Sequence, residues 1–84
     1  MVSYIRVMKM QSVYEQQYIK FGLKVQYYRK LRGLTQEAFA DRLGLSWSYV
    51  AKIESPARAF GVSMETLFKI SDVLDVPVAK LFEE

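Results

Sequence analysis

The sequence predicts a small all-α domain of five helices. Apolar residues between positions 14 and 28 recur at alternating steps of four and three, which places them on one face of a helix. They are Tyr14, Tyr18, Phe21, Val25 and Tyr28. Hydroxyl residues also stand where helix starts need capping groups. Only residues 1–11 depart from this pattern, because Val2, Tyr4 and Ile5 look strand-like.

The first predicted helix contains this stripe. Ser12 followed by Glu15 fits a capping box, which marks a helix start. Gly33 suits the end of the same helix, since glycine readily leaves the helical conformation. We therefore expect a helix over about 13–32, with its lysine and arginine residues mostly off the apolar stripe.

The later helices each follow a hydroxyl side chain that can accept a hydrogen bond from the first turn. The predicted helices and N-caps are 36–43 after Thr35, 47–54 after Ser46 and 64–74 after Ser63. The apolar face of the helix over 64–74 comprises Met64, Leu67, Phe68, Ile70, Val73 and Leu74. Residues 56–61 form a loop, and Pro77 suits the first turn of a short last helix that carries Val78, Leu81 and Phe82.

Residues 36–55 predict two short helices joined by a tight turn. Gly44 can take the left-handed conformation that ends the first and redirects the chain. Ala40 suits a close helix–helix crossing, where a larger side chain would separate the backbones. Val50 and Ile53 place apolar groups on the inner side of the second helix. This is the pattern of a helix-turn-helix, which elsewhere holds a helix in the major groove of DNA.

Composition excludes several classes of function. The 84 residues contain no cysteine and no histidine, so disulfides, the usual metal ligands and the usual general base are missing. We expect no cofactor and no metal. No apolar run approaches the roughly 18 residues of a membrane span, and no signal-peptide core is found at the N-terminus, so a cytoplasmic protein without membrane contact is expected.

Charge is distributed unevenly along the chain. Residues 1–35 hold seven lysines and arginines against one acid, whereas residues 63–84 hold two lysines against five acids. This asymmetry indicates one anion-facing side. The alternative is a solvated helix that happens to be rich in basic residues.

From about Phe21 to Phe82 the chain resembles the lambda-repressor-like group of DNA-binding domains, also called the Cro/repressor or XRE family. The matching segments are 34–37, 39–40, 43–46, 48–50, 53–54 and 63–67. The resemblance covers roughly three-quarters of the chain and implies a DNA-binding domain over 19–84. Residues 1–18 lie outside it as an N-terminal extension, whose end is expected to continue into the first helix. Asp75 stands where the family often has glycine, and Ser55-Pro56 replaces a frequent Asn-Gly.

Helical spacing selects the candidate base-reading residues. With Val50 and Ile53 inside, Ser48 and Lys52 point outward, and Trp47 lies on the flank near the helix start. Recognition helices read bases mainly through such N-terminal positions, so Trp47, Ser48 and Lys52 are the candidates. Trp47 suits a thymine methyl or a sugar; the alternative is a half-buried residue that braces the turn.

The candidate phosphate-binding residues are Gln36, Tyr49, Arg58 and Lys30. Gln36 opens a helix, where free N–H groups favour anions, and the resemblance implies the same role. Arg58 lies in the loop after the third helix and can hold a phosphate with its planar guanidinium. For Tyr49 the alternative is plain packing, and for Lys30 it is simple solvation.

Arg29 and Glu54 are assigned to the architecture instead. Each follows an inner-face residue directly, so each lies beside a buried surface, where a charge needs a partner. The family resemblance implies that they form a partly buried ion pair.

We therefore expect a sequence-specific transcriptional regulator, most simply a repressor, that binds double-stranded DNA as a homodimer on a palindromic operator. Two places are candidates for the dimer contact, the final helix and the N-terminal segment. The alternatives are that the final helix packs back on the first helix and that the N-terminal apolar stripe only extends the domain's own core. No domain for a small-molecule ligand is expected. The alternative function is a protein-interaction module such as an antitoxin, with DNA binding secondary; an enzyme is disfavoured because no convergent catalytic groups are found.

Overall fold

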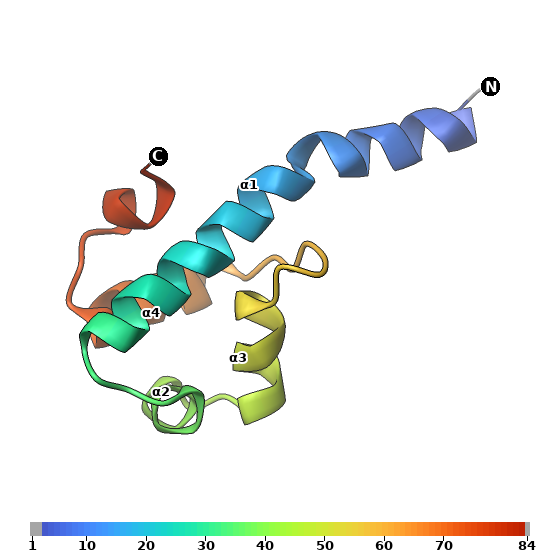
Figure 1. Cartoon of the computed structure of the whole chain (residues 1–84). Helices are drawn as coiled ribbons and strands as arrows, with labels where there is room; N and C mark the ends of the chain where they lie inside the picture. The colour runs from blue at the N-terminus through green and yellow to red at the C-terminus, as the bar shows by residue number, and fades with distance from the viewer. Residues whose placement is uncertain (1–2, 84) are drawn as a thin grey trace.

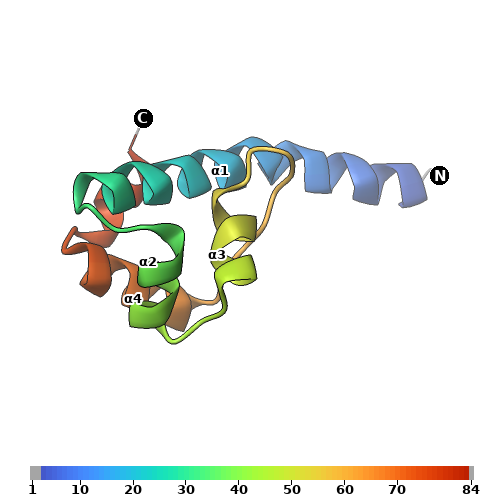
Figure 2. The ribbon, with the colours of Figure 1, turned by 60° about the horizontal axis from the view of Figure 1, so that its bottom comes forward.

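The computed structural model describes residues 3–83 as four α-helices and one 3-10 helix. These are α1 (Ser3–Leu31), α2 (Gln36–Leu43), α3 (Trp47–Glu54), α4 (Met64–Leu74) and η1 (Val78–Phe82). Within residues 3–83 no strand is found. The all-α class is therefore confirmed, while the expected fifth helix is a single stretch of 3-10 helix. Figures 1 and 2 show α1 lying along the other elements and projecting beyond them at its N-terminal end.

The N-terminal boundary predicted from sequence is wrong. α1 begins at Ser3, so Ser12 and Glu15 lie inside a helix rather than at its start. Tyr4 and Ile5, which look strand-like, also lie in α1, and Val2 is outside the described residues. Extending an existing helix adds a hydrogen bond per residue, and β-branched or aromatic residues oppose this by only a few tenths of a kcal/mol.

The predicted boundaries of α2, α3 and α4 are confirmed, and their N-caps have the expected geometry. Thr35 Oγ1 accepts from the backbone N–H of Ala38 at 3.0 Å. Ser46 Oγ accepts from the N–H of Tyr49 at 3.1 Å. Gly44 ends α2 in the left-handed conformation with φ 73°. These local hydrogen bonds set the lengths of the two helices that form the turn.

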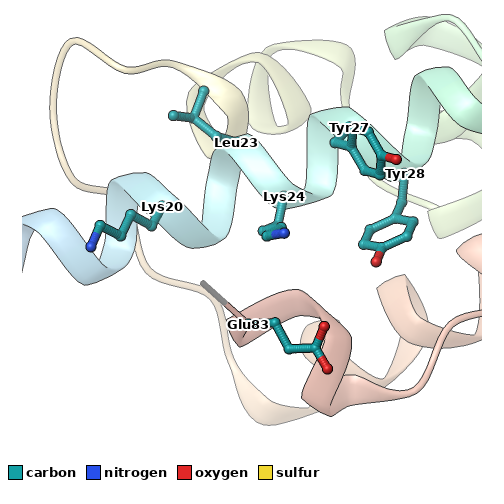
Figure 3. Close-up of a pocket in the computed structure, with 6 residues that line it drawn as sticks. All are labelled: Lys20, Leu23, Lys24, Tyr27, Tyr28 and Glu83. Carbon is teal, nitrogen blue, oxygen red and sulfur yellow. The ribbon is translucent and has the colours of Figure 1, made fainter.

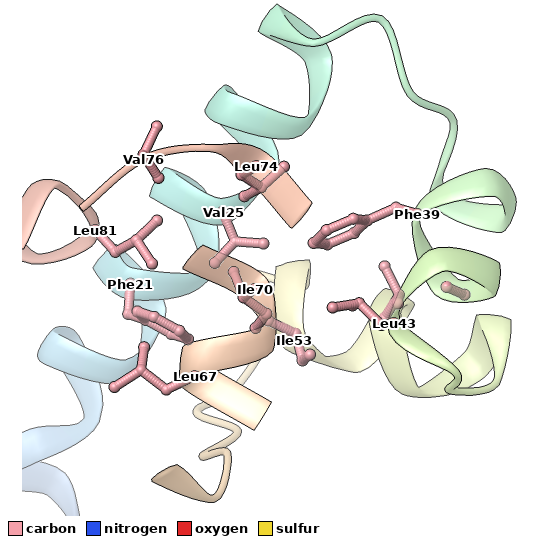
Figure 4. Packing of buried hydrophobic residues seen from close by; sticks show 12 residues of the cluster. Phe21, Val25, Phe39, Leu43, Ile53, Leu67, Ile70, Leu74, Val76 and Leu81 are labelled. Carbon is pink, nitrogen blue, oxygen red and sulfur yellow. The ribbon is translucent and has the colours of Figure 1, made fainter. Parts of the chain in front are cut away.

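The core lies between α1, α4 and η1 on one side and α2 and α3 on the other (Figure 4). Its fully buried side chains are Val25, Phe39, Leu43, Val50, Ile70, Leu74 and Leu81. The apolar face predicted for α4 is only partly buried, because Met64 and Phe68 are both more than half exposed. Leu67, Ile70 and Leu74 already fill the side of α4 that faces the core, so these two side chains remain outside.

The apolar stripe of α1 is only partly buried. Phe21 and Val25 are buried, whereas Tyr14 and Tyr18 are exposed because they lie nearer the projecting end of the helix. Tyr18 contacts the loop at Gly61, where a Cβ atom would come within 3.1 Å of the tyrosine ring. Phe82 of η1 stacks on Phe21, with ring centroids 5.2 Å apart.

A glycine sets the approach of α1 to α3. A Cβ atom added at Gly22 would overlap the backbone carbonyl of Ile53, near the end of α3. Only a residue without a side chain allows the two helices to come this close. Gly22 therefore holds α3 directly against α1, and this contact fixes where the outer face of α3 lies.

Arg32 joins the end of α1 to the end of α4. Its Nε donates to the carbonyl oxygen of Leu74 at 2.7 Å, and its Nη2 donates to that of Asp75 at 3.1 Å. Asp75 ends α4 in the left-handed conformation with φ 55°, in the place where the family resemblance suggested glycine. The arginine satisfies carbonyls that a helix end leaves without partners, and its charge suits the negative end of the helix dipole.

Candidate nucleic-acid interface

The outer face of α3 is open to solvent. Val50 and Ile53 are almost fully buried beneath it. On the opposite side Ser48 and Lys52 are exposed, and Trp47 is 57% exposed. Figure 2 shows α2 and α3 next to each other beneath α1, with the turn between them at the edge of the molecule. The three residues predicted to read bases therefore lie together on one accessible surface.

A buried ion pair lies directly behind this surface. Arg29 of α1 donates from Nε to Glu54 Oε2 at 2.7 Å and from Nη2 to Oε1 at 2.9 Å. Its Nη1 donates to the carbonyl oxygen of Leu34 at 2.7 Å. Glu54 is 2% exposed and Arg29 is 7% exposed. Because each charge is matched by a partner of opposite sign, both can be buried without an unpaired ion.

Gln36 connects the ion pair to the exposed surface. Its Nε2 donates to Glu54 Oε1 at 3.0 Å, and its Oε1 accepts from the indole Nε1 of Trp47 at 3.1 Å. One line of hydrogen bonds thus runs from Arg29 through Glu54 and Gln36 to Trp47. The residue predicted to bind phosphate and a residue predicted to read bases are joined, and Trp47 both braces the turn and is exposed.

Lys52 and Arg58 line the same shallow cavity of about 270 Å³ at the C-terminal end of α3. Ala51, Ser55, Ala57 and Phe60 complete its lining. Both cationic side chains are exposed. The loop after α3 therefore brings Arg58 back beside the outer face of the helix, so the two cations can approach one strand of an anionic polymer together.

Tyr49 is half-buried and packs against the same loop. Its ring lies edge-on to the ring of Phe60, with centroids 5.3 Å apart and planes at 84°. This contact holds the ring in place, which is consistent with the packing role considered for Tyr49 from the sequence. The contact of its hydroxyl group with phosphate stays a prediction. Ser48 Oγ lies 3.3 Å from Ser46 Oγ, in a polar pair at the start of α3.

Lys30 lies on a different element from the other candidates. It is exposed in the last turn of α1, whereas the remaining cations of the candidate surface come from α3 and the loop that follows it. Lys30 would therefore contact a bound polymer from the side of the α1–α2 connection.

A larger cavity of about 470 Å³ lies between α1 and the end of η1 (Figure 3). It is lined by Lys20, Leu23, Lys24, Tyr27, Tyr28 and Glu83. In Figure 3 the aromatic rings stand at one end of this cavity and Glu83 faces α1 across it. Leu23 and Tyr27 are exposed. The cavity is bounded by elements other than α2 and α3, so it is separate from the candidate interface.

In the part of the chain that the structure describes, no group of three or more metal-ligating side chains is found. Among those same residues no helix is long and apolar enough to cross a bilayer.

Sequence reasoning missed the contact between Gln36 and Trp47, because 11 positions separate them and no periodic pattern relates residues across a turn.

Comparisons with known proteins agree with this geometry. The model of a family described as helix-turn-helix, HTH_3, matches residues 25–81. An uncharacterized HTH-type transcriptional regulator of Sinorhizobium medicae is 32% identical over 66 residues, which are 79% of this chain and 46% of that protein. The chain spans about half the length of the first curated relatives it matches.

Two solved structures are similar over about three-quarters of the chain. The restriction-modification controller protein C.AhdI from Aeromonas hydrophila has a TM-score of 0.70 and 34% identity, covering 77% of this chain and 96% of that chain. SinR, a master regulator for biofilm formation solved in complex with DNA, has a TM-score of 0.68 and 33% identity, covering 75% of this chain and 98% of that chain.

Proposed function

The chain belongs to the helix-turn-helix family HTH_3, of the XRE type, and from this membership we propose that it is a sequence-specific DNA-binding transcriptional regulator. The observation that carries the proposal is the open outer face of α3, with Ser48 and Lys52 exposed above a buried ion pair. A helix held in this way can enter a major groove with its polar side chains at the surface.

Lys52 and Ser48 are the proposed hydrogen-bonding base readers. An ammonium group donates well to guanine N7 or O6, and a hydroxyl serves purine or pyrimidine edges. The proposed phosphate contacts come from Gln36, at the start of α2, and from the cationic or hydroxyl groups of Arg58, Tyr49 and Lys30. The side-chain amide of Gln36 donates one Nε2 hydrogen to Glu54, so its contact with phosphate would use the second Nε2 hydrogen or the N–H groups at the start of α2.

The test is selection of bound duplexes from a random pool, with Lys52→Ala in parallel. We expect the unaltered chain to enrich a defined sequence and Lys52→Ala to bind that sequence about 5- to 150-fold more weakly, the equivalent of about 1–3 kcal/mol for a base contact. Lys69→Ala is the matched control, because Lys69 is exposed on α4 in a surface pair with Glu65. Enrichment of no sequence would overturn the proposal.

We further propose that it acts as a homodimer on a palindromic operator, as a repressor that occupies the site. One helix-turn-helix contacts too few bases for high specificity, so two copies about 34 Å apart are needed. Exposed apolar side chains of α1 and η1, among them Leu23, Tyr27 and Phe82, offer surface for a second copy. A two-fold symmetric consensus supports this proposal, and an asymmetric one contradicts it.

The same experiment separates this function from that of an antitoxin-like interaction module. Such a module would form a stoichiometric complex with another protein and would enrich DNA only weakly or only when that protein is bound. Strong enrichment by the isolated chain favours the regulator.

A further inference from the structure

The indole of Trp47 has no free hydrogen-bonding group. An indole carries one donor, Nε1–H, and no acceptor. That donor is directed to Gln36 Oε1 at 3.1 Å, while the side chain remains 57% exposed. The surface that Trp47 presents at the start of α3 therefore consists of C–H groups and the aromatic face.

The orientation of Gln36 follows from the chemistry of its two partners. The carboxylate of Glu54 only accepts hydrogen bonds and the indole of Trp47 only donates one. Gln36 must therefore direct its Nε2 to Glu54, at 3.0 Å, and its Oε1 to Trp47. The reverse orientation of the amide would leave two acceptors facing each other and two donors facing each other. The buried ion pair thus orients the Gln36 amide so that its oxygen accepts the indole N–H at the surface.

We propose that Trp47 reads the 5-methyl group of a pyrimidine in the major groove, which in ordinary DNA is that of thymine. Base edges in this groove present donors, acceptors and a single apolar group, the C5-methyl of thymine. Among these base-edge groups, an aromatic surface without a free donor is complementary to the methyl group. The inference rests on the proposed function, because it requires α3 to lie in the major groove.

The neighbouring side chains leave this role to Trp47. Ser48 and Lys52 carry the polar groups of the exposed face, so they are suited to donors and acceptors on other bases. Trp47 stands at the first position of α3, among the N-terminal positions that reach base edges. The operator is therefore expected to contain, in each half-site, one thymine recognised through its methyl group.

The experiment replaces each thymine of the selected duplex in turn by deoxyuridine, which lacks only the methyl group. Trp47 is the single tryptophan of the chain, so its fluorescence reports binding directly. We expect one position per half-site at which the replacement weakens binding about fourfold, the value for removing one buried methyl group from contact.

Three variants test whether Trp47 is responsible. Trp47→Ala should bind thymine and deoxyuridine duplexes equally, and the binding of this variant is followed with a labelled duplex. Trp47→Phe keeps an aromatic ring without the N–H group, is also followed with a labelled duplex, and should retain the discrimination. Lys52→Ala is the control: it should weaken binding to both duplexes and leave their ratio unchanged.

The outcomes distinguish this inference from the function on which it rests. If the chain enriches no sequence, the proposed function and the inference both fall. If it enriches a sequence but tolerates deoxyuridine at every position, the inference alone is overturned. It is likewise overturned if discrimination persists in Trp47→Ala, because another side chain then reads the methyl group, or if Trp47→Phe loses it, because the N–H then matters.

Discussion

Replacing Glu54 by alanine removes the acceptor on which the interior beneath α3 depends. The carboxylate takes two hydrogen bonds from Arg29, at 2.7 and 2.9 Å, and one from Gln36 at 3.0 Å. The variant leaves the guanidinium of Arg29, only 7% exposed, without its counter-charge. Removing one partner of a buried ion pair typically costs about 3–5 kcal/mol. We expect about 3 kcal/mol, the lower end of that range, because Arg29 keeps its bond to the carbonyl of Leu34.

The assay is urea unfolding followed by far-ultraviolet circular dichroism. For a domain of this size, a loss of about 3 kcal/mol corresponds to a fall in Tm of about 12–24 °C, so thermal melting gives an independent check. Lys69→Ala is the surface control and should change stability by no more than about 0.5 kcal/mol.

A double variant separates the lost charge partner from lost packing. Arg29→Met with Glu54→Leu removes both charges and keeps apolar volume, a replacement that is often neutral or stabilising for buried pairs. We expect this double variant to be more stable than Glu54→Ala alone. If Glu54→Ala unfolds at the same urea concentration as the unaltered chain, the pair contributes nothing to stability and the reasoning is refuted.

Three further predictions concern the close helix crossing, the end of α4 and the salt dependence. Gly22→Ala should lower the free energy of unfolding by about 1–3 kcal/mol, because the added Cβ would overlap the Ile53 carbonyl. An unchanged urea midpoint would contradict the close crossing of α1 and α3. Asp75→Gly should raise the free energy of unfolding by about 1 kcal/mol, since glycine takes φ 55° without strain and the substitution removes a negative charge from the C-terminus of α4. A lower Tm would argue against this. If each protomer neutralises about three phosphates, the log–log slope of dimer affinity against salt is about −5, whereas a flat dependence in fluorescence titrations is incompatible with phosphate contacts.

The helices of the turn could be predicted from sequence because their boundaries depend on local chemistry. Thr35 and Ser46 accept hydrogen bonds from backbone N–H groups three residues further on, and Gly44 supplies a conformation that most residues avoid. Each of these interactions is complete within one turn of helix. The bounds of α2, α3 and α4 therefore agree with the sequence prediction, and the exposed positions of Ser48 and Lys52 follow from the same spacing.

Features that depend on distant contacts could not be predicted in this way. Periodicity shows that Met64 and Phe68 share a side of α4 with other apolar residues, but it does not show how much of that side the neighbouring helices cover. The close contact of Gly22 with Ile53 joins positions 31 residues apart, and a glycine inside a helical pattern gives no indication of its partner. The start of α1 was misplaced for a related reason, since a capping box within a helix looks the same in sequence as one at its start.

The line of hydrogen bonds from Arg29 to Trp47 also neutralises a buried negative charge near the candidate interface, which the sequence alone does not reveal. Glu54 lies behind a surface proposed to meet phosphates, and an unpaired carboxylate there would repel them. Arg29 neutralises that charge inside the protein, within 2.7 Å. Gln36 then links this pair to Trp47 at the surface through a neutral amide, so the indole is oriented without a further charge being added. Residues that sequence reasoning assigned separately to architecture and to DNA binding are therefore joined in one hydrogen-bonded network, and in the proposed complex with DNA the buried pair determines which atoms of Trp47 face a base.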